Sequence, residues 1–177
     1  MSGRIVVFRS SDYPQIEFAL PSLRRALEDN GIRHTERDLR HYLPSLSQES
    51  IVITFAQLDR LTHRKIGEYD LSKPESYAIE RVGKELHLVG ADETGAMYAV
   101  LEAAEQIRLR GFDNVEEVRH APFLEKRGVK VNLPFEPYDT GDPFELNYET
   151  LLDKEYWRRF IDSLAGSRYN LLSLWSE

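Results

Sequence analysis

The chain has 177 residues, of which 41% are hydrophobic and 30% charged, as is ordinary for a soluble globular protein of one or two domains. Its formal net charge is −7, and acidic residues interrupt its basic ones, so the clustered positive surface that nucleic-acid binding requires is not expected. No apolar run approaches the roughly 20 residues needed to cross a bilayer. We therefore expect neither a nucleic-acid partner nor a membrane.

The N-terminus, MSGRIVVFRSSDY, lacks a charged region followed by an apolar one, so no secretory signal peptide is recognised. If this N-terminus is native, the expected location is the cytoplasm; otherwise the location is unknown. The chain has no cysteine, which excludes disulfides, thiolate zinc sites and cysteine nucleophiles. Its five histidines show no H-E-x-x-H or close pairing, and no phosphate-binding glycine motif occurs. We expect no metal and no cofactor.

The first elements are a strand, a helix and a second strand. RIVVFRS (4–10) is apolar and β-branched, which predicts a strand. PSLRRALEDNG (21–31) has leucines at near-helical spacing, a proline at its start and Asn30-Gly31 at its end, which predicts a short amphipathic helix. SIVITFAQ (50–57) is again rich in β-branched residues and is predicted to be a strand.

A hairpin and a long helix follow. SYAIERV and ELHLVG flank Gly83-Lys84, a two-residue connection suited to a type II′ turn. ADETGAMYAVLEAAEQIRLRG carries one apolar stripe, with Asp92 or Thr94 available as the N-cap and Gly111 after its end. Together these elements predict a small α/β or α+β domain over residues 1–110, in which helices cover one sheet.

The pattern changes after residue 110. Residues 111–126 are polar, contain proline and are predicted to form a linker. A strand at 127–133, a long loop at 133–150, a helix ending at Gly166 and the strand YNLLSLW then describe a strand–helix–strand unit with parallel strands. One such unit cannot cover both faces of its own parallel sheet. Residues 127–177 are therefore expected to be the beginning of a domain.

A known accessory domain shares the pattern of the hairpin and the long helix. ESYAIERVGKELHLVGADETGAMYAVLEAAEQI (75–107) resembles the small α/β domain before the catalytic barrel in family 20 glycoside hydrolases (β-hexosaminidases) and in α-glucuronidases. The family pattern is an E-x-Y-x-[IL] strand, a return strand, and a helix with a G-x-x-Y-[GA] signature. The resemblance implies a domain that packs beside the barrel without being catalytic. The matching positions are Glu75, Tyr77, Ile79, Gly95, Tyr98 and Ala99.

The C-terminal third continues this resemblance. PFLEKRGVKVNLP looks like the first barrel strand, where family members carry Arg-Gly before an apolar strand. The family often reads K-x-N before its second strand, and Arg168 and Asn170 occupy those places here. Two positions depart from β-hexosaminidases, which carry an acid in place of Asn132 and a histidine in place of Trp175. An α-glucuronidase-like or less characterised glycoside hydrolase is therefore the better match.

The resemblance also implies residues that would contact substrate. Arg127 matches an arginine that holds sugar hydroxyls in β-hexosaminidases; the alternative is a structural salt bridge at the base of the strand. Asn132 is expected either to contact sugar or to cap a loop. Trp175 is expected either to stack on sugar or to lie in the barrel core. Because loops after barrel strands form the active-site face, residues 133–150 are expected at the substrate rim.

No catalytic residue is assigned. Glycoside hydrolysis needs an acid and a partner group across the glycosidic bond, and in similar barrels that acid follows a later strand. A complete barrel takes about 250 residues, so this chain by itself is expected to be inactive. Its expected partners are the remainder of the barrel and, through the full-length protein, an oligosaccharide or polysaccharide. The alternative is a stand-alone α/β binding or protein-interaction module with no catalytic activity.

Overall fold

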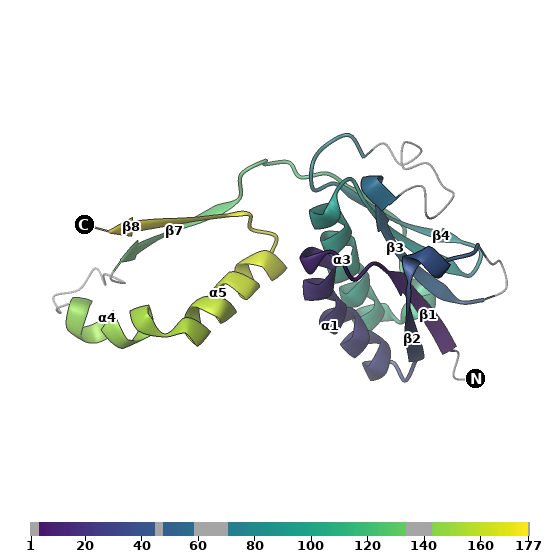
Figure 1. Cartoon of the computed structure of the whole chain (residues 1–177), viewed down its shortest axis with the longest axis horizontal. Coiled ribbons are helices and arrows are strands. Elements are labelled where there is room, and N and C mark those ends of the chain that lie inside the picture. Colours follow the sequence, from purple (N-terminus) through teal and green to yellow (C-terminus); the bar gives the residue numbers. More distant parts are fainter. Residues whose placement is uncertain (1–3, 45–47, 59–70, 134–142, 177) are drawn as a thin grey trace. The chain divides into compact units, whose positions relative to one another are not determined.

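The computed structural model describes residues 4–44, 48–58, 71–133 and 143–176, and the chain divides into unit 1 (Met1–Phe123) and unit 2 (Leu124–Glu177) (Figure 1). Unit 1 contains β1 (Arg4–Arg9), α1 (Pro14–Asp29), β2 (Arg33–Asp38), the 3-10 turn η1 (Leu39–His41), β3 (Ser50–Phe55), η2 (Ala56–Leu58), β4 (Tyr77–Val82), β5 (Glu85–Gly90), α3 (Glu93–Arg110), η4 (Phe112–Asn114) and β6 (Val118–His120). Unit 2 contains β7 (Gly128–Leu133), α4 (Pro143–Leu152), α5 (Lys154–Gly166) and β8 (Leu171–Ser176).

Unit 1 is built on a six-stranded sheet of order β2-β1-β3-β5-β4-β6. The neighbours β2, β1, β3 and β5 run parallel, whereas β4 is antiparallel to both β5 and β6. Helices α1 and α3 pack side by side on one face of this sheet (Figure 1). This arrangement confirms the α/β fold with helices on one sheet that the sequence predicted.

The core of unit 1 explains why its strands are so rich in β-branched residues. Every residue of β3 is buried, so both of its faces are covered, as a strand inside a parallel sheet requires. Each fully buried aliphatic side chain contributes about 1.5–3 kcal/mol to folding. Core residues from the strands and both helices include Ile5, Val7, Leu20, Leu27, Ile51, Ile53, Leu86, Leu88, Val100 and Ile107.

The glycine of the accessory-domain signature is a packing residue. One carboxylate oxygen of Asp92 accepts a hydrogen bond from the Gly95 N–H (2.7 Å), which caps α3, and the other accepts one from the Glu75 N–H (2.9 Å). A Cβ on Gly95 would lie 2.3 Å from the carbonyl oxygen of Ser76. The signature therefore fastens the start of α3 to the segment that leads into β4.

The first helix is longer than predicted, and one strand was missed. α1 begins at Pro14 rather than at residue 21, and Pro21 lies inside it, although an interior proline costs about 3 kcal/mol. The buried face continues N-terminal of Pro21 through Ile16 and Leu20, which supports the helix across the proline. Strand β2, RHTERD, has no apolar residue and lies at the edge of the sheet, so its sequence shows no strand pattern.

The predicted linker over 111–126 is wrong for its first ten residues. Phe112 and Val115 are buried, and β6 adds a sixth strand through the antiparallel partners Val118 and Ile79. Unit 1 therefore extends to Phe123. In the sequence, the buried residues Phe112 and Val115 are surrounded by polar residues, and this polar composition is why a linker was predicted here.

Unit 2 is the predicted strand–helix–strand unit, because β7 and β8 pair in parallel from Gly128 opposite Leu171 to Leu133 opposite Ser176. Part of the loop expected over 133–150 is helix α4, and residues 134–142 lie outside the described residues. Helices α4 and α5 break at Asp153, whose carboxylate accepts a hydrogen bond from the Glu155 N–H (2.8 Å).

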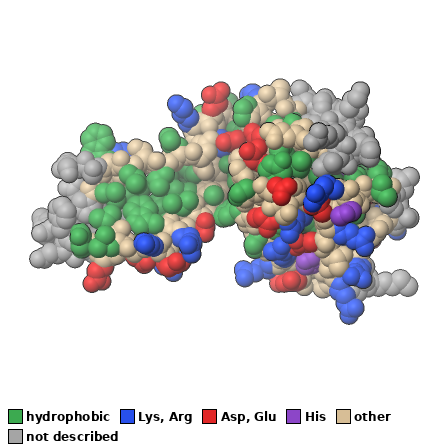
Figure 2. Space-filling view, in the orientation of Figure 1, with side chains coloured by type: hydrophobic (Ala, Val, Ile, Leu, Met, Phe, Trp, Pro, Cys, Tyr) green, Lys and Arg blue, Asp and Glu red, His purple; other side chains and the backbone are tan. Residues whose placement is uncertain are grey.

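Burial separates the two units sharply. Among the residues of unit 2 whose burial is described, none is buried. Large apolar side chains are exposed instead: Ile161 by 50%, Leu174 by 51% and Trp175 by 56%. Figure 2 shows hydrophobic side chains gathered on the surface of this unit, over β7, β8 and α5. In the described part of the chain, no helix is long and apolar enough to cross a membrane.

Replacing Gly95 with alanine should destabilise unit 1 by about 1–3 kcal/mol, because the added methyl group meets a backbone oxygen that cannot rotate away. Urea unfolding followed by circular dichroism measures this loss. The matched control is Gly166→Ala, since no atom lies within 4 Å of a Cβ at that helical position. The control should be neutral or stabilising by up to about 1 kcal/mol. If Gly95→Ala had the same free energy of unfolding as the wild type, this result would contradict the packing role of Gly95.

Candidate functional site

The pairing of β7 with β8 brings two of the predicted site residues together. Asn132 lies directly opposite Trp175, and Lys130 lies opposite Ser173. Because side chains two residues apart on a strand point to the same side, these four form one surface, here called the polar face. The Lys130 Nζ lies 4.3 Å from the centre of the Trp175 ring, within the range of a cation–π interaction.

The polar face presents groups suited to binding a carbohydrate. An indole ring offers a flat apolar surface, while an ammonium, an amide and a hydroxyl offer hydrogen bonds to sugar hydroxyls. Trp175 is 56% exposed, so its ring is accessible on unit 2. Lys130 and Ser173 were not predicted as site residues. They lie two residues before Asn132 and Trp175, and this spacing on a strand indicates that they share a side of the sheet with them.

Arg127 lies at the opposite end of the two-stranded sheet, just before β7 begins. Its Nε donates a hydrogen bond to the Arg168 carbonyl oxygen and its Nη1 donates one to the Leu124 carbonyl oxygen, both at 2.7 Å. These are structural contacts with backbone carbonyl groups at the base of the strand. The structure therefore does not bring Arg127 together with Asn132 and Trp175, and its contact with sugar stays a prediction.

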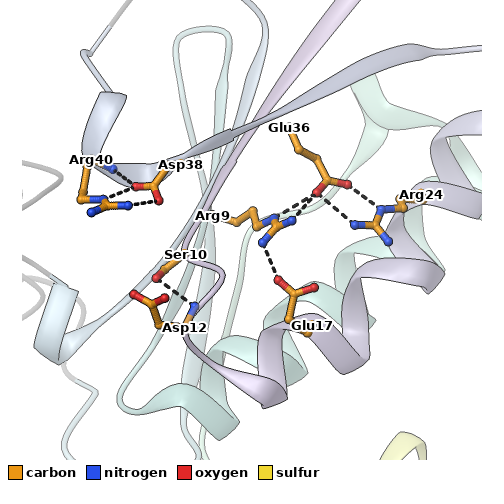
Figure 3. A network of polar contacts seen from close by, with 8 residues as sticks. All are labelled: Arg9, Ser10, Asp12, Glu17, Arg24, Glu36, Asp38 and Arg40. Carbon is orange, nitrogen blue, oxygen red and sulfur yellow. Dashed lines mark hydrogen bonds and ion pairs between the residues drawn. The ribbon is translucent and has the colours of Figure 1, made fainter.

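Unit 1 carries a separate cluster of charged side chains where β1 and β2 end beside α1 (Figure 3). The Arg9 Nε donates to Glu36 at 2.9 Å, and the Arg24 Nη2 donates to the same carboxylate at 3.0 Å. Arg9 also forms an ion pair with Glu17 on the first turn of α1. The Glu17 and Glu36 carboxylates are therefore each held by at least one guanidinium.

The charges in this cluster stabilise the fold. The hydrogen bond from Arg24 is the main cause that lowers the pKa of Glu36. The bond from Arg9 lowers this pKa further, while burial raises it.

Nearby, hydrogen bonds from the Arg40 side chain and backbone lower the pKa of Asp38, which caps η1. Carboxylates held in their charged form serve poorly as general acids at neutral pH. The cluster fastens α1 to the edge of the sheet.

A third polar group is buried in the core of unit 1. The Tyr42 hydroxyl donates a hydrogen bond to Glu85 (2.7 Å), and the His87 Nε2 lies 3.1 Å from the same carboxylate oxygen. All three side chains are almost fully buried. Such bonds satisfy a carboxylate that burial has removed from water. Within the described residues, no group of three or more histidine, aspartate or glutamate side chains is placed to hold a metal ion.

Sequence comparisons identify no relative, whereas solved structures share the fold. No family model and no curated protein matches the chain. A GH138 enzyme targeting pectin rhamnogalacturonan II matches 98% of this chain at a TM-score of 0.66 and 22% identity. A second structure, CpGH84D, matches 66% of this chain and 19% of its own at a TM-score of 0.45 and 14% identity, which is too distant to support an argument.

The match to the GH138 enzyme spans 24% of that enzyme's chain, so this chain corresponds to about a quarter of it. At this level of identity the likeness shows the fold alone. The chain therefore shares the α/β fold of that part of the GH138 enzyme, and its assignment to the glycoside hydrolases stays a prediction. The narrower assignment to β-hexosaminidases or α-glucuronidases stays a prediction.

Replacing Glu36 with glutamine should lower the free energy of unfolding of unit 1 by about 1 kcal/mol at neutral pH. Because folding lowers the pKa of Glu36, its carboxylate stabilises the fold above the unfolded value of about 4.3. That contribution is lost as the pH falls through the lower, folded pKa. Unfolding titrations between about pH 7 and pH 3 should therefore show a shallower loss of stability in Glu36→Gln than in the wild type.

The matched control is Glu116→Gln, which removes an ion pair with Arg110 in which both side chains are at least half exposed. Exposed pairs contribute little, so this variant should lose at most about 0.5 kcal/mol. If Glu36→Gln kept the wild-type dependence on pH, the charged cluster would not be what holds α1 to the sheet.

Proposed function

We propose that the chain is the N-terminal, non-catalytic portion of a carbohydrate-active glycoside hydrolase. Unit 1 is its accessory α/β domain, and unit 2 is the first strand–helix–strand of its (β/α)₈ barrel. The polar face of β7 and β8 contributes to the substrate rim of the complete enzyme. The remainder of the barrel is the partner of unit 2 and supplies the catalytic carboxylates.

The observation that carries this proposal is the contrast in burial between the units. Unit 1 has a covered core, whereas unit 2 exposes Ile161, Leu174 and Trp175. Parallel strands require cover on both faces, and further strand–helix units of a barrel would provide it. The structural match over 98% of this chain but 24% of the GH138 enzyme supports the same reading.

The finer proposal is an α-glucuronidase-like enzyme or a related one that acts on acidic sugars. Lys130 places an ammonium group over one face of the Trp175 ring, where it can pair with a sugar carboxylate while the other face of the ring stacks on the sugar. The GH138 enzyme targets pectin rhamnogalacturonan II. Neutral sugars would gain no ion pair from Lys130.

The first test is to read the coding sequence beyond Glu177. The proposal expects several hundred further residues of alternating strands and helices, because a complete barrel takes about 250 residues and its acid follows a later strand. A stop codon directly after Glu177, with a monomeric product, would contradict it. That outcome would favour the stand-alone interaction module, whose docking surface would be the exposed apolar side chains of unit 2.

In the longest natural chain that contains these residues, Trp175→Ala should weaken binding of polygalacturonate about tenfold, because the sugar loses its stacking surface. Isothermal titration calorimetry measures the affinity, with a neutral arabinan as the comparison polysaccharide. Phe123→Ala is the matched control, since Phe123 is a 97% exposed aromatic outside β7 and β8. Unchanged affinity in Trp175→Ala would remove the polar face from the substrate rim.

A further inference from the structure

The register between β7 and β8 decides whether a polar face exists at all. A slip of one residue would turn Trp175 to the opposite side of the sheet relative to Asn132. In most sheets burial of one face fixes the register, but none of the residues of unit 2 whose burial is described is buried. An isolated two-stranded sheet is also only marginally stable in water. Another set of contacts must therefore hold these strands in place.

Hydrogen bonds at the base of the two strands provide those contacts. The Asn170 side chain accepts a bond from the Arg127 N–H (2.9 Å) and donates one to the Glu125 carbonyl oxygen (2.7 Å). The backbone N–H groups of Asn170 and Leu171 both donate to the Arg127 carbonyl oxygen, at 2.9 and 3.2 Å. The Arg127 guanidinium then reaches the Arg168 carbonyl oxygen at 2.7 Å.

Gly128 adds a steric contact to these bonds. It lies opposite Leu171, and a Cβ at Gly128 would lie 2.9–3.2 Å from three side-chain atoms of that leucine. The missing side chain leaves room for Leu171 against the start of β7. Arg168 itself has a φ of +64°, a conformation that turns the chain into β8 and that non-glycine residues adopt only where their surroundings hold them.

We propose that Arg127 and Asn170 are positioning residues that set the register of β7 against β8 and so place Asn132 opposite Trp175. The bonds join the segments directly before the two strands, so any slip of β8 along β7 would break several of them together. This role differs from the substrate contact that the resemblance implied for Arg127. It rests on the proposed function only in treating the polar face as part of a sugar-binding rim.

Disulfide trapping in the cysteine-free chain tests this role directly. Lys130→Cys with Ser173→Cys joins register partners, whose Cα atoms lie within reach of a disulfide. Lys130→Cys with Leu171→Cys joins positions offset by two residues, about 8 Å apart and beyond that reach. With the positioning residues intact, the first pair should oxidise at least about tenfold faster than the second. Mass spectrometry after timed quenching measures both rates.

Removing the positioning residues should abolish that selectivity. In the double variant Arg127→Met with Asn170→Ala, the oxidation rates of the two cysteine pairs should differ by less than about threefold. The reason is that losing a single hydrogen bond can change the equilibrium between the native register and a slipped one by about tenfold. Asn170→Asp keeps the acceptor for the Arg127 N–H and should give an intermediate ratio. The control is Arg158→Met, which removes an exposed pair with Glu155 and should leave the ratio unchanged.

Two results would overturn the proposal: selectivity that stays near tenfold without the positioning residues, or no selectivity with them present. Unfolding of unit 2 would also equalise the two rates, so circular dichroism is recorded for each variant, and selectivity that is lost only together with the helical signal of α4 and α5 would count against a role in register. The measurement uses this chain alone. A stop codon after Glu177 would therefore contradict the proposed function and leave the register result standing.

Discussion

A parallel β-sheet needs cover on both faces, because its strands are apolar on both sides and its crossovers place helices against them. Unit 1 meets this requirement, with α1 and α3 on one face of the sheet and the central strand β3 buried throughout. The described part of unit 2 has two parallel strands and two helices, and none of its residues whose burial is described is buried. The proposed function of the chain rests on this difference in burial between the two units.

The chemical character of the two units follows the same division. The polar clusters of unit 1 are internally paired: guanidinium groups hold the Glu36 carboxylate, and a tyrosine hydroxyl and an imidazole meet that of Glu85. The polar face of unit 2 presents Lys130 and Trp175 on an exposed sheet surface. A supporting role for unit 1 and a ligand-facing role for part of unit 2 are consistent with these contacts.

The elements predicted from sequence were those with a strong periodic pattern. Strands β1 and β3, the Gly83-Lys84 hairpin, helix α3 with its Asp92 cap, and the parallel pair in unit 2 all appear. Strand β2 could not be found from periodicity, because its stability comes from pairing with β1 rather than from apolar residues. The start of α1 was hidden by Pro21, a residue that usually lies at a helix end.

The candidate site was predictable only in part, for a related reason. The resemblance implied Asn132 and Trp175 as candidate site residues, and the register then added Lys130 and Ser173. Register depends on contacts between segments far apart in sequence, which a single strand's pattern does not contain. The contacts of Arg127 with Arg168 and Asn170 are of this kind, and they give the arginine a structural setting that the resemblance did not imply.

The central claim is that unit 1 is complete while unit 2 awaits further strands. Native-state hydrogen exchange on the monomeric 177-residue chain tests it most directly. The account predicts that backbone amides of β1, β3 and β5 exchange only through global unfolding, whereas those of β7 and β8 exchange orders of magnitude faster through local opening. Equal protection of the two sheets in a monomer would show that unit 2 is stable by itself and would contradict the account.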